Sequence, residues 1–215
     1  MDKRELTRIE GNLRSKYLEM PEEIYRAKGL VIMGRRIKSV IFTTDIAIIR
    51  SCNADAVLAV YPFTPQQIIS QSIINVAPMP VFVGVGGGIT NGIRSAMIAN
   101  VVDIPVIATV IHENVDVQAR LDAGVSILNV SAAARTPEVV RKIREKFPKV
   151  PIIATGGPTP ESILATIEAG ADCISYTPPS TAEIFADIMK SYREQEDVSL
   201  PAEDQVTILD AMENI

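Results

Sequence analysis

Two glycine-rich turns are the most chemically suggestive features of this sequence. Gly156 and Gly157 lie in "PIIATGGPTPES", and Gly86, Gly87 and Gly88 lie in "VFVGVGGGITN". Glycine has no Cβ, so an anion can approach its backbone N–H closely, and a helix that starts behind the turn adds its own N–H groups and dipole. We therefore predict a phosphate site at Gly156 and Gly157, and a further ligand contact at the second turn. Close packing of a tight turn is the alternative explanation for both.

Three ionisable residues also follow apolar runs and are candidates for acid–base chemistry. Asp45 comes shortly after "SVIF", and His112 and Glu113 come directly after "VIATVI". An imidazole or a carboxylate beside a bound ligand can transfer protons, so we assign these three residues as catalytic candidates. For His112, the single histidine of the chain, a structural or surface position is the alternative.

Uncharged polar residues extend the candidate site. Asn129, inside the apolar run "SILNVS", is assigned to ligand binding. The last apolar run is followed by Pro178 and Pro179, which have no N–H to donate to an anion. We therefore expect the hydroxyl groups of Thr177 and Ser180 to complete the phosphate site.

The residue pattern argues against zinc and against a Schiff-base lysine. Residue 116 is Asp, so the chain has no His-Glu-x-x-His motif, and it has no second histidine. Asp45 and Glu113 could hold Mg²⁺ through a bound phosphate. The lysines lie in the N-terminal region, at the start of the first apolar run or in helical segments, which disfavours a Schiff-base aldolase.

The order of the apolar runs predicts the scaffold that positions these residues. Seven short runs recur from Lys38 onward, each followed by a segment with helical spacing: "SVIFTTD", "AVLAVYPF", "VFVGVGGG", "VIATVI", "SILNVS", "PIIATGG" and "CISYTPP". Apolar strands that alternate with amphipathic helices are typical of a parallel sheet covered by helices. The evenly spaced units favour a TIM-type (β/α) barrel, either complete or with seven visible units, over an open doubly wound sheet. Both architectures collect ligands at the carboxyl ends of their strands.

The remaining segments are expected to frame this barrel. The run "GLVIMG" at 29–34 is too close to the first unit for a helical crossover, so it is expected to pair antiparallel or to cap the bottom of the barrel. Hydroxyl N-caps of helices are predicted at Thr136 and Thr159, each followed by proline, and a capping box is predicted to begin with Ser180. We expect an N-terminal helical arm at 1–37, the barrel at 38–193, and an acidic tail with a short helix at 194–215.

Composition narrows the class of protein. The 215 residues are 47% hydrophobic and 22% charged, which suits one large α/β domain, and the net charge of −5 argues against nucleic acid as a partner. Cys52 and Cys173 are expected to be buried free thiols of a reducing cytoplasm. The charged N-terminus is unlike a signal peptide, and no apolar run is long enough to span a membrane. Apolar helix faces predict a homo-oligomer.

One stretch resembles a known group of proteins. "PIIATGGPTPESILATIEAGADCIS" is similar to the phosphate-binding (β/α) barrels, such as the ribulose-phosphate-binding group, over Val150 to Ser175, and more loosely from Lys38. The resemblance implies a phosphate at the Gly-Gly turn. It also implies a phosphorylated small molecule as ligand, with lyase, isomerase or hydrolase chemistry.

Two other functions remain open at this point. The glycerol-responsive antiterminator family has a similar Gly-Gly phosphate turn, which would imply a non-enzymatic ligand sensor. FMN-binding barrels are the third alternative, disfavoured because five Phe, five Tyr and no Trp leave few partners for stacking on a flavin.

Overall fold

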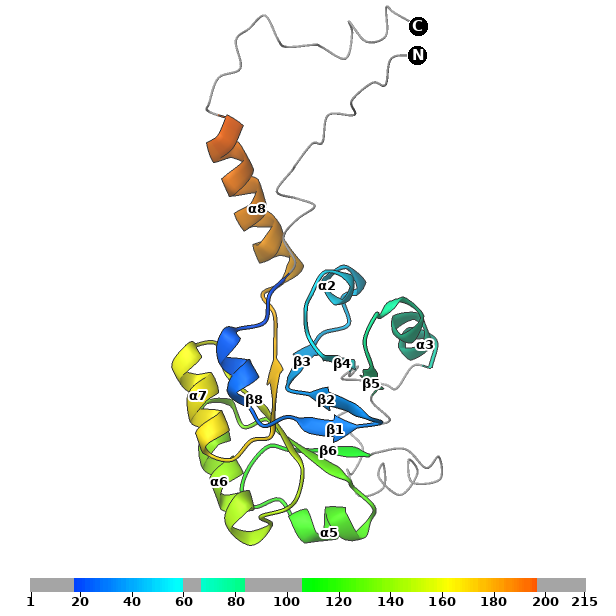
Figure 1. The fold of residues 1–215 in the computed structure, drawn as a ribbon, viewed down its shortest axis with the longest axis vertical. Helices are drawn as coiled ribbons and strands as arrows, with labels where there is room; N and C mark the ends of the chain where they lie inside the picture. The colour runs from blue at the N-terminus through cyan, green and yellow to red at the C-terminus, as the bar shows by residue number, and fades with distance from the viewer. Residues whose placement is uncertain (1–17, 60–66, 84–105, 197–215) are drawn as a thin grey trace, which may run out of the picture. The chain divides into compact units, whose positions relative to one another are not determined.

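The computed structural model describes residues 18–59, 67–83 and 106–196 (Figure 1). Seven strands form one parallel half-barrel sheet in the order β5-β4-β3-β9-β8-β7-β6. The strands are β3 (Ser39–Phe42), β4 (Ala56–Ala59), β5 (Val81–Val83), β6 (Ile107–Val110), β7 (Ile127–Val130), β8 (Ile152–Thr155) and β9 (Cys173–Tyr176). The seven predicted apolar runs are thus confirmed as parallel strands.

Helices follow six of the seven strands, as the alternating pattern predicts. They are α2 (Ile46–Arg50), α3 (Gln67–Val76), α5 (Val117–Asp122), α6 (Thr136–Lys146), α7 (Pro160–Glu168) and α8 (Thr181–Glu196). Two short 3-10 helices, η1 (Glu22–Arg26) and η3 (Ala133–Arg135), complete the described elements. The segment 17–178 forms one compact unit, whereas α8 belongs to a second unit and is described by itself.

Barrel closure is the part of the predicted fold that the described residues leave incomplete. Strands β5 and β6 stand at the two ends of the sheet, and no pairing joins them within the described ranges. The prediction of a TIM-type barrel is therefore confirmed only as a seven-stranded parallel sheet of the half-barrel kind.

The inner face of the sheet has an apolar core toward the amino ends of the strands. Buried residues from five strands and the hairpin form one cluster: Ile37, Val40, Ala56, Leu58, Ile127, Ile153 and Cys173. Successive side chains of a strand point to opposite faces. The neighbours Ile41, Leu128 and Ile174 are accordingly buried on the outer face, which the helices cover (Figure 1).

A small hairpin packs against this cluster. Strand β1 (Leu30–Ile32) pairs antiparallel with β2 (Arg35–Ile37). The turn between them has positive φ at Met33 (48°) and Gly34 (81°), as a two-residue hairpin turn requires. Ile37 belongs to the interior cluster, and Leu30 and Ile32 pack against it. Both expectations for the segment 29–34 are therefore confirmed: it pairs antiparallel, and it covers the interior near the amino ends of the strands.

The helix starts follow local sequence with one exception. Thr159 caps α7 in a capping box with Ser162, and Ser180 exchanges hydrogen bonds with Glu183 at the start of α8. The prediction that Thr136 is an N-cap is wrong. Helix η3 precedes α6 directly, so Thr136 is its first helical residue, and its hydroxyl bonds back to Ala132 N and Ala133 O.

A largely buried ion pair joins the amino ends of β8 and β9. Arg144 Nη2 lies 2.5 Å from Asp172 Oδ2, and the two side chains are 18% and 15% exposed. Arg144 also donates from Nε to Gly170 O (2.8 Å) and from Nη1 to Val150 O (2.5 Å). The same carboxylate oxygen accepts from Ile152 N at 2.9 Å. Gly170 and Asp172, in the stretch Ala-Gly-Ala-Asp at 169–172, therefore help to link β9 to β8 at the edge of the sheet opposite the predicted ligand site.

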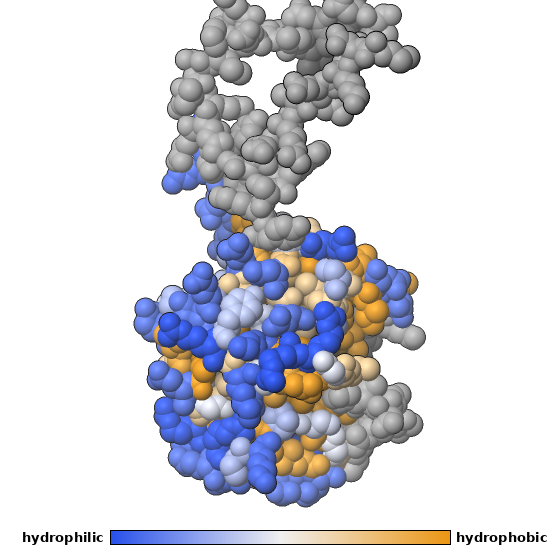
Figure 2. All heavy atoms as spheres, in the orientation of Figure 1, coloured by the Kyte–Doolittle hydropathy of each residue, from blue (hydrophilic) through white to orange (hydrophobic). Residues whose placement is uncertain are grey.

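The surface shown in Figure 2 is largely hydrophilic, with apolar patches between charged side chains. Exposed large apolar residues include Val31 and Met33 on the hairpin and Ile68 on α3. No helix in the described ranges is both long and apolar enough to cross a bilayer.

Candidate functional site

The Gly-Gly turn after β8 lies at the carboxyl edge of the sheet, but its two glycines differ. Gly156 N donates to Ser175 O at 3.1 Å, which continues the pairing of β8 with β9. A Cβ at Gly156 would lie 2.7 Å from Ile174 Cγ2 and 2.9 Å from Ile163 Cγ1. Gly156 therefore allows close packing between strand and helix, and its N–H is not available to an anion.

Gly157 has the properties expected of an anion-binding glycine. Its φ is +82°, a conformation that favours glycine. Its N–H has no acceptor among the described residues. The capping box already occupies the N–H groups of Thr159 and Ser162, whereas the N–H of Glu161 in the first turn of α7 has no described acceptor. Two open N–H groups thus flank the start of a nine-residue helix.

Four polar side chains lie on the inner face near the same edge. On β6, β7, β8 and β9, an apolar inward residue is followed two positions later by a polar one: Thr109, Asn129, Thr155 and Ser175. Asn129 Nδ2 donates to Thr109 Oγ1 at 3.3 Å, and the hydroxyl groups of Thr155 and Ser175 lie 3.4 Å apart. We call these four residues the inner polar row.

The inner polar row contains one residue that the sequence analysis assigns to ligand binding and three to which it assigns no role. Asn129 was assigned to ligand binding from its position in an apolar run. Thr109, Thr155 and Ser175 carry the same signal, a single polar residue on the inward side of an apolar strand. Period-two spacing in neighbouring runs could have revealed all four.

Glu113 lies in a network of exposed charges after β6. Its Oε1 is 2.5 Å from Arg135 Nη2 and 3.7 Å from Lys142 Nζ. Lys142 also contacts Glu138 at 2.7 Å. The backbone N–H of Glu113 and then the Arg135 guanidinium lower the pKa of the Glu113 carboxyl to about 2. A carboxyl with this pKa stays ionised at neutral pH, so the geometry favours a structural role over general acid catalysis.

Asp45 and His112 both lie at the carboxyl edge of the sheet, after different strands. Asp45 caps α2, and its Oδ1 accepts from Ala47 N (2.8 Å) and Ile48 N (3.1 Å). His112 is exposed in the loop between β6 and α5. Three strands stand in the sheet order between β3, which Asp45 follows, and β6, which His112 and Glu113 follow.

The other predicted ligand contacts are placed in part. Thr177 is exposed just after β9, at the same edge as Gly157. Ser180 belongs to the second unit, where it caps α8 through Glu183. Gly86, Gly87 and Gly88 lie outside the described residues.

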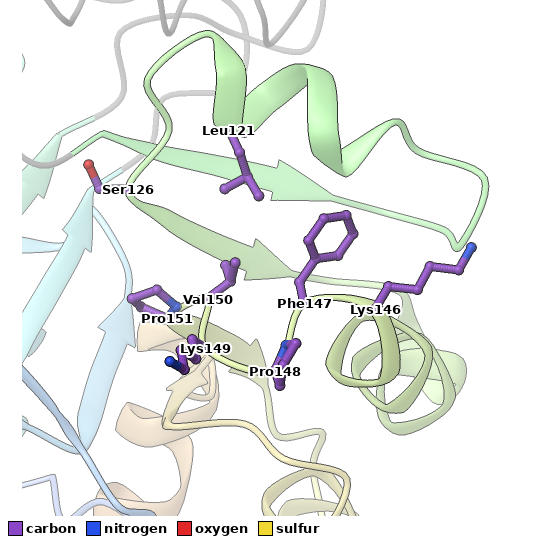
Figure 3. A pocket seen from close by; sticks show the side chains of 8 residues that line it. All are labelled: Leu121, Ser126, Lys146, Phe147, Pro148, Lys149, Val150 and Pro151. Carbon is purple, nitrogen blue, oxygen red and sulfur yellow. The ribbon is translucent and has the colours of Figure 1, made fainter.

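Two surface hollows lie in the outer layer rather than at the inner polar row. One, of about 460 Å³, is lined by residues of α5 and the segment from α6 to β8, including Leu121, Phe147 and Val150 (Figure 3). The other, of about 530 Å³, lies between the Glu113–Gln118 segment and α6. The first is at the amino ends of β7 and β8, opposite the Gly-Gly turn.

The described residues offer little for metal or thiol chemistry. They contain no group of three or more His, Cys, Asp or Glu side chains that could hold a metal ion. Cys52 and Cys173 are free and buried, as expected, and burial raises the pKa of both thiols. Neither cysteine is therefore poised as a thiolate nucleophile.

Comparison with known proteins places the fold but no family. No protein-family model and no curated protein matches the chain. Among solved structures, it is similar to the BexX/CysO complex of Amycolatopsis orientalis, with a TM-score of 0.51 and 13% identity over 84% of this chain and 99% of that one.

Two further structures give weaker matches. The glycerol uptake operon antiterminator regulatory protein of Listeria monocytogenes has a TM-score of 0.49 and 14% identity over 67% of this chain and 95% of that one. Orotidine 5′-monophosphate decarboxylase of Metallosphaera sedula has a TM-score of 0.45 and 12% identity over 73% and 98%. At such identities a likeness concerns the fold alone, and of these three structures only the BexX/CysO match, with a TM-score above 0.5, supports the observed α/β architecture.

Proposed function

We propose that this protein binds a small phosphorylated metabolite at the carboxyl ends of the strands, with the phosphate at the turn between β8 and α7. One observation carries the proposal: Gly157 holds an open N–H in a left-handed turn directly before a helix of nine residues. Open N–H groups and the positive end of the helix dipole both favour an anion there.

Fewer backbone N–H groups are open to an anion at this turn than the sequence pattern indicates. Gly156 supports the turn by packing, since its N–H is bonded to Ser175 O. The open donors are the N–H groups of Gly157 and Glu161, and the hydroxyl of Thr177 is exposed at the same edge. The inner polar row faces the interior beside this turn and supplies contacts for the rest of the ligand.

A substitution at Gly157 tests the phosphate site directly. Any Cβ at Gly157 would lie 2.5 Å from Ser162 Oγ, so the Ser162 hydroxyl must move for every substitution there. A β-branched valine is in addition unsuited to a φ of +82°. Aspartate tolerates the left-handed region better than most residues and adds a negative charge at the anion position. We expect Gly157→Asp to weaken binding of inorganic phosphate, measured by isothermal titration calorimetry, by roughly tenfold or more. Gly157→Asn adds a side chain of similar size without the charge, so the difference between the two variants gives the effect of the charge alone.

Gly34 provides a matched control. It has the same backbone conformation, with φ of +81°, and no atom within 4 Å of a Cβ. Gly34→Asp is therefore expected to bind inorganic phosphate as the wild type does. Folded Gly157→Asp protein with unchanged phosphate affinity would contradict the proposed site.

Catalysis is the extension of this proposal. Asp45 caps a helix and Glu113 is held ionised, so His112 is the candidate best placed for proton transfer of the lyase, isomerase or hydrolase kind. If the protein is such an enzyme, His112→Gln should abolish turnover of a bound phosphate ester while leaving its affinity unchanged. Equal turnover by both proteins would remove His112 from the chemistry.

A further inference from the structure

The inner polar row contains a buried amide whose hydrogen bonds are incomplete. Asn129 is 8% exposed, and its Nδ2 donates to Thr109. Its Oδ1 is buried and has no partner among the described residues. A buried polar atom without a partner is costly, so such atoms usually receive one from a ligand or an ordered water.

Two other buried polar atoms lack partners in the described ranges, and both lie off the inner face. Glu113 Oε2 belongs to a carboxylate whose other oxygen is ion-paired with Arg135. Arg120 Nε lies on α5, and the same guanidinium donates from Nη1 to Asp116 O. Asn129 differs because it lies two residues after Ile127, an interior residue of the same strand, and therefore points to the same inner face.

The described strands that form the wall around Asn129 carry no formal charge. None of the seven described strands contains Asp, Glu, Lys, Arg or His. Cys173 stays a neutral thiol, because burial raises its pKa. A charged ligand group pressed against this wall would be buried without a partner, which is strongly unfavourable. The part of a ligand that reaches Asn129 is therefore neutral.

A hydroxyl group suits this position better than a pure donor or a pure acceptor. The Thr109 hydroxyl can accept a hydrogen bond from Asn129 Nδ2 or donate one to Oδ1, so the amide can bond to Thr109 in either orientation. One orientation leaves a ligand facing an acceptor, and the other leaves it facing a donor. Only a group that both donates and accepts is satisfied in both.

We propose that Asn129 is a specificity-determining residue that hydrogen-bonds a neutral hydroxyl of the ligand, with Thr109 positioning the amide. This inference rests on the proposed function, because it assumes that the ligand's phosphate is bound at the turn before α7. It defines the ligand as a phosphate monoester with an uncharged, hydroxyl-bearing end.

Matched phosphate esters test the inference without knowledge of the natural ligand. The probes are 2-hydroxyethyl, 3-hydroxypropyl and 4-hydroxybutyl phosphate, each compared by calorimetry with the alkyl phosphate of the same chain length. At one length at least, the hydroxyl is expected to tighten binding by roughly fivefold to tenfold. Esters of the same lengths that end in a carboxylate are expected to bind more weakly than either.

Variants assign the effect to Asn129. Asn129→Leu should abolish the preference for the hydroxylated ester, and Thr109→Val should reduce it. Asn75→Leu, an exposed change on α3, should leave it intact. If Asn129→Leu does not fold, loss of the preference in Thr109→Val, together with a shifted Asn129 side-chain amide resonance in the wild type, serves the same purpose.

Each contrary outcome has its own meaning. If wild-type protein binds inorganic phosphate and both ester series with equal affinity, the phosphate site stands and the role of Asn129 is refuted. Retention of the preference in Asn129→Leu also refutes that role. If neither inorganic phosphate nor any ester binds, the proposed function fails, and the inference fails with it.

Discussion

Two arginine–carboxylate pairs in this protein have the same N–O distance of 2.5 Å but different exposure to water. The Arg144–Asp172 side chains are 18% and 15% exposed, whereas the Arg135–Glu113 side chains are 54% and 25% exposed. We expect removal of the arginine to destabilise the protein strongly in the first pair and weakly in the second. The comparison is between Arg144→Met and Arg135→Met, since methionine keeps much of the side-chain length.

The magnitude for Arg144 follows from its contacts. Arg144→Met removes the bond to Asp172 and the bonds to the carbonyl oxygens of Gly170, Val150 and Pro148. Breaking a buried pair costs about 3–5 kcal/mol. Because both side chains keep some contact with water, we expect the lower end, about 3 kcal/mol. Arg144→Lys should reduce the free energy of unfolding by a smaller amount than Arg144→Met, because an ammonium keeps the charge but cannot reproduce the planar fork of a guanidinium.

Urea denaturation followed by circular dichroism measures the difference. With a slope of about 3 kcal/mol per molar urea, the midpoint of Arg144→Met should fall by about 1 M. The midpoint of Arg135→Met should stay close to that of the wild type, because exposed pairs are screened by solvent. Equal losses in the two variants, or no loss in Arg144→Met, would refute the argument that burial decides the strength of these pairs.

Two further predictions concern the site itself. The Glu113 carboxyl has a pKa of about 2 against an ordinary value of 4.5, so it should stabilise the folded protein above pH 4.5 and lose this contribution as the pH falls toward 2. The melting temperatures of wild type and Glu113→Gln should therefore become equal in acid. In an NMR titration, Arg135→Met should raise the pKa of Glu113 only part of the way to 4.5, because the hydrogen bond from the backbone N–H of Glu113 remains. A full return to 4.5 would contradict the larger effect of the backbone N–H. Gly156→Ala should cost about 1–3 kcal/mol by overpacking against Ile163 and Ile174. An unaltered melting temperature would show that α7 shifts enough to accommodate the added methyl group.

The strand order of this protein follows from its sequence more readily than the details of its site. The parallel strands are short apolar runs, most of them buried on both faces, which is a strong local signal. Thr159 and Ser180 carry recognisable caps. The prediction of an N-cap at Thr136 is wrong because the 3-10 helix η3 directly precedes α6. The Thr136 hydroxyl stabilises η3 by donating to Ala133 O, so Thr136 lies inside the helical segment. Self-association stays a prediction.

The site depends on pairing between distant segments, which local patterns do not contain. The N–H of Gly156 is unavailable because the register of β8 against β9 places it opposite Ser175 O. Glu113 looks like a catalytic carboxylate in sequence, but Arg135, 22 residues later, holds it in an ion pair. Asn129 was found because an amide is conspicuous in an apolar run, whereas the small hydroxyl residues beside it were not.

The position of β3 has a consequence for biosynthesis. This strand pairs with β4, the next strand of the sheet in the chain, and also with β9, whose residues 174–176 are made more than 130 residues later. A chain emerging from the ribosome therefore carries β3 with one row of backbone groups unpaired until translation has passed Tyr176. Unpaired strand edges are templates for aggregation, so the interval between the synthesis of the first and last strands is when the nascent protein most needs a chaperone.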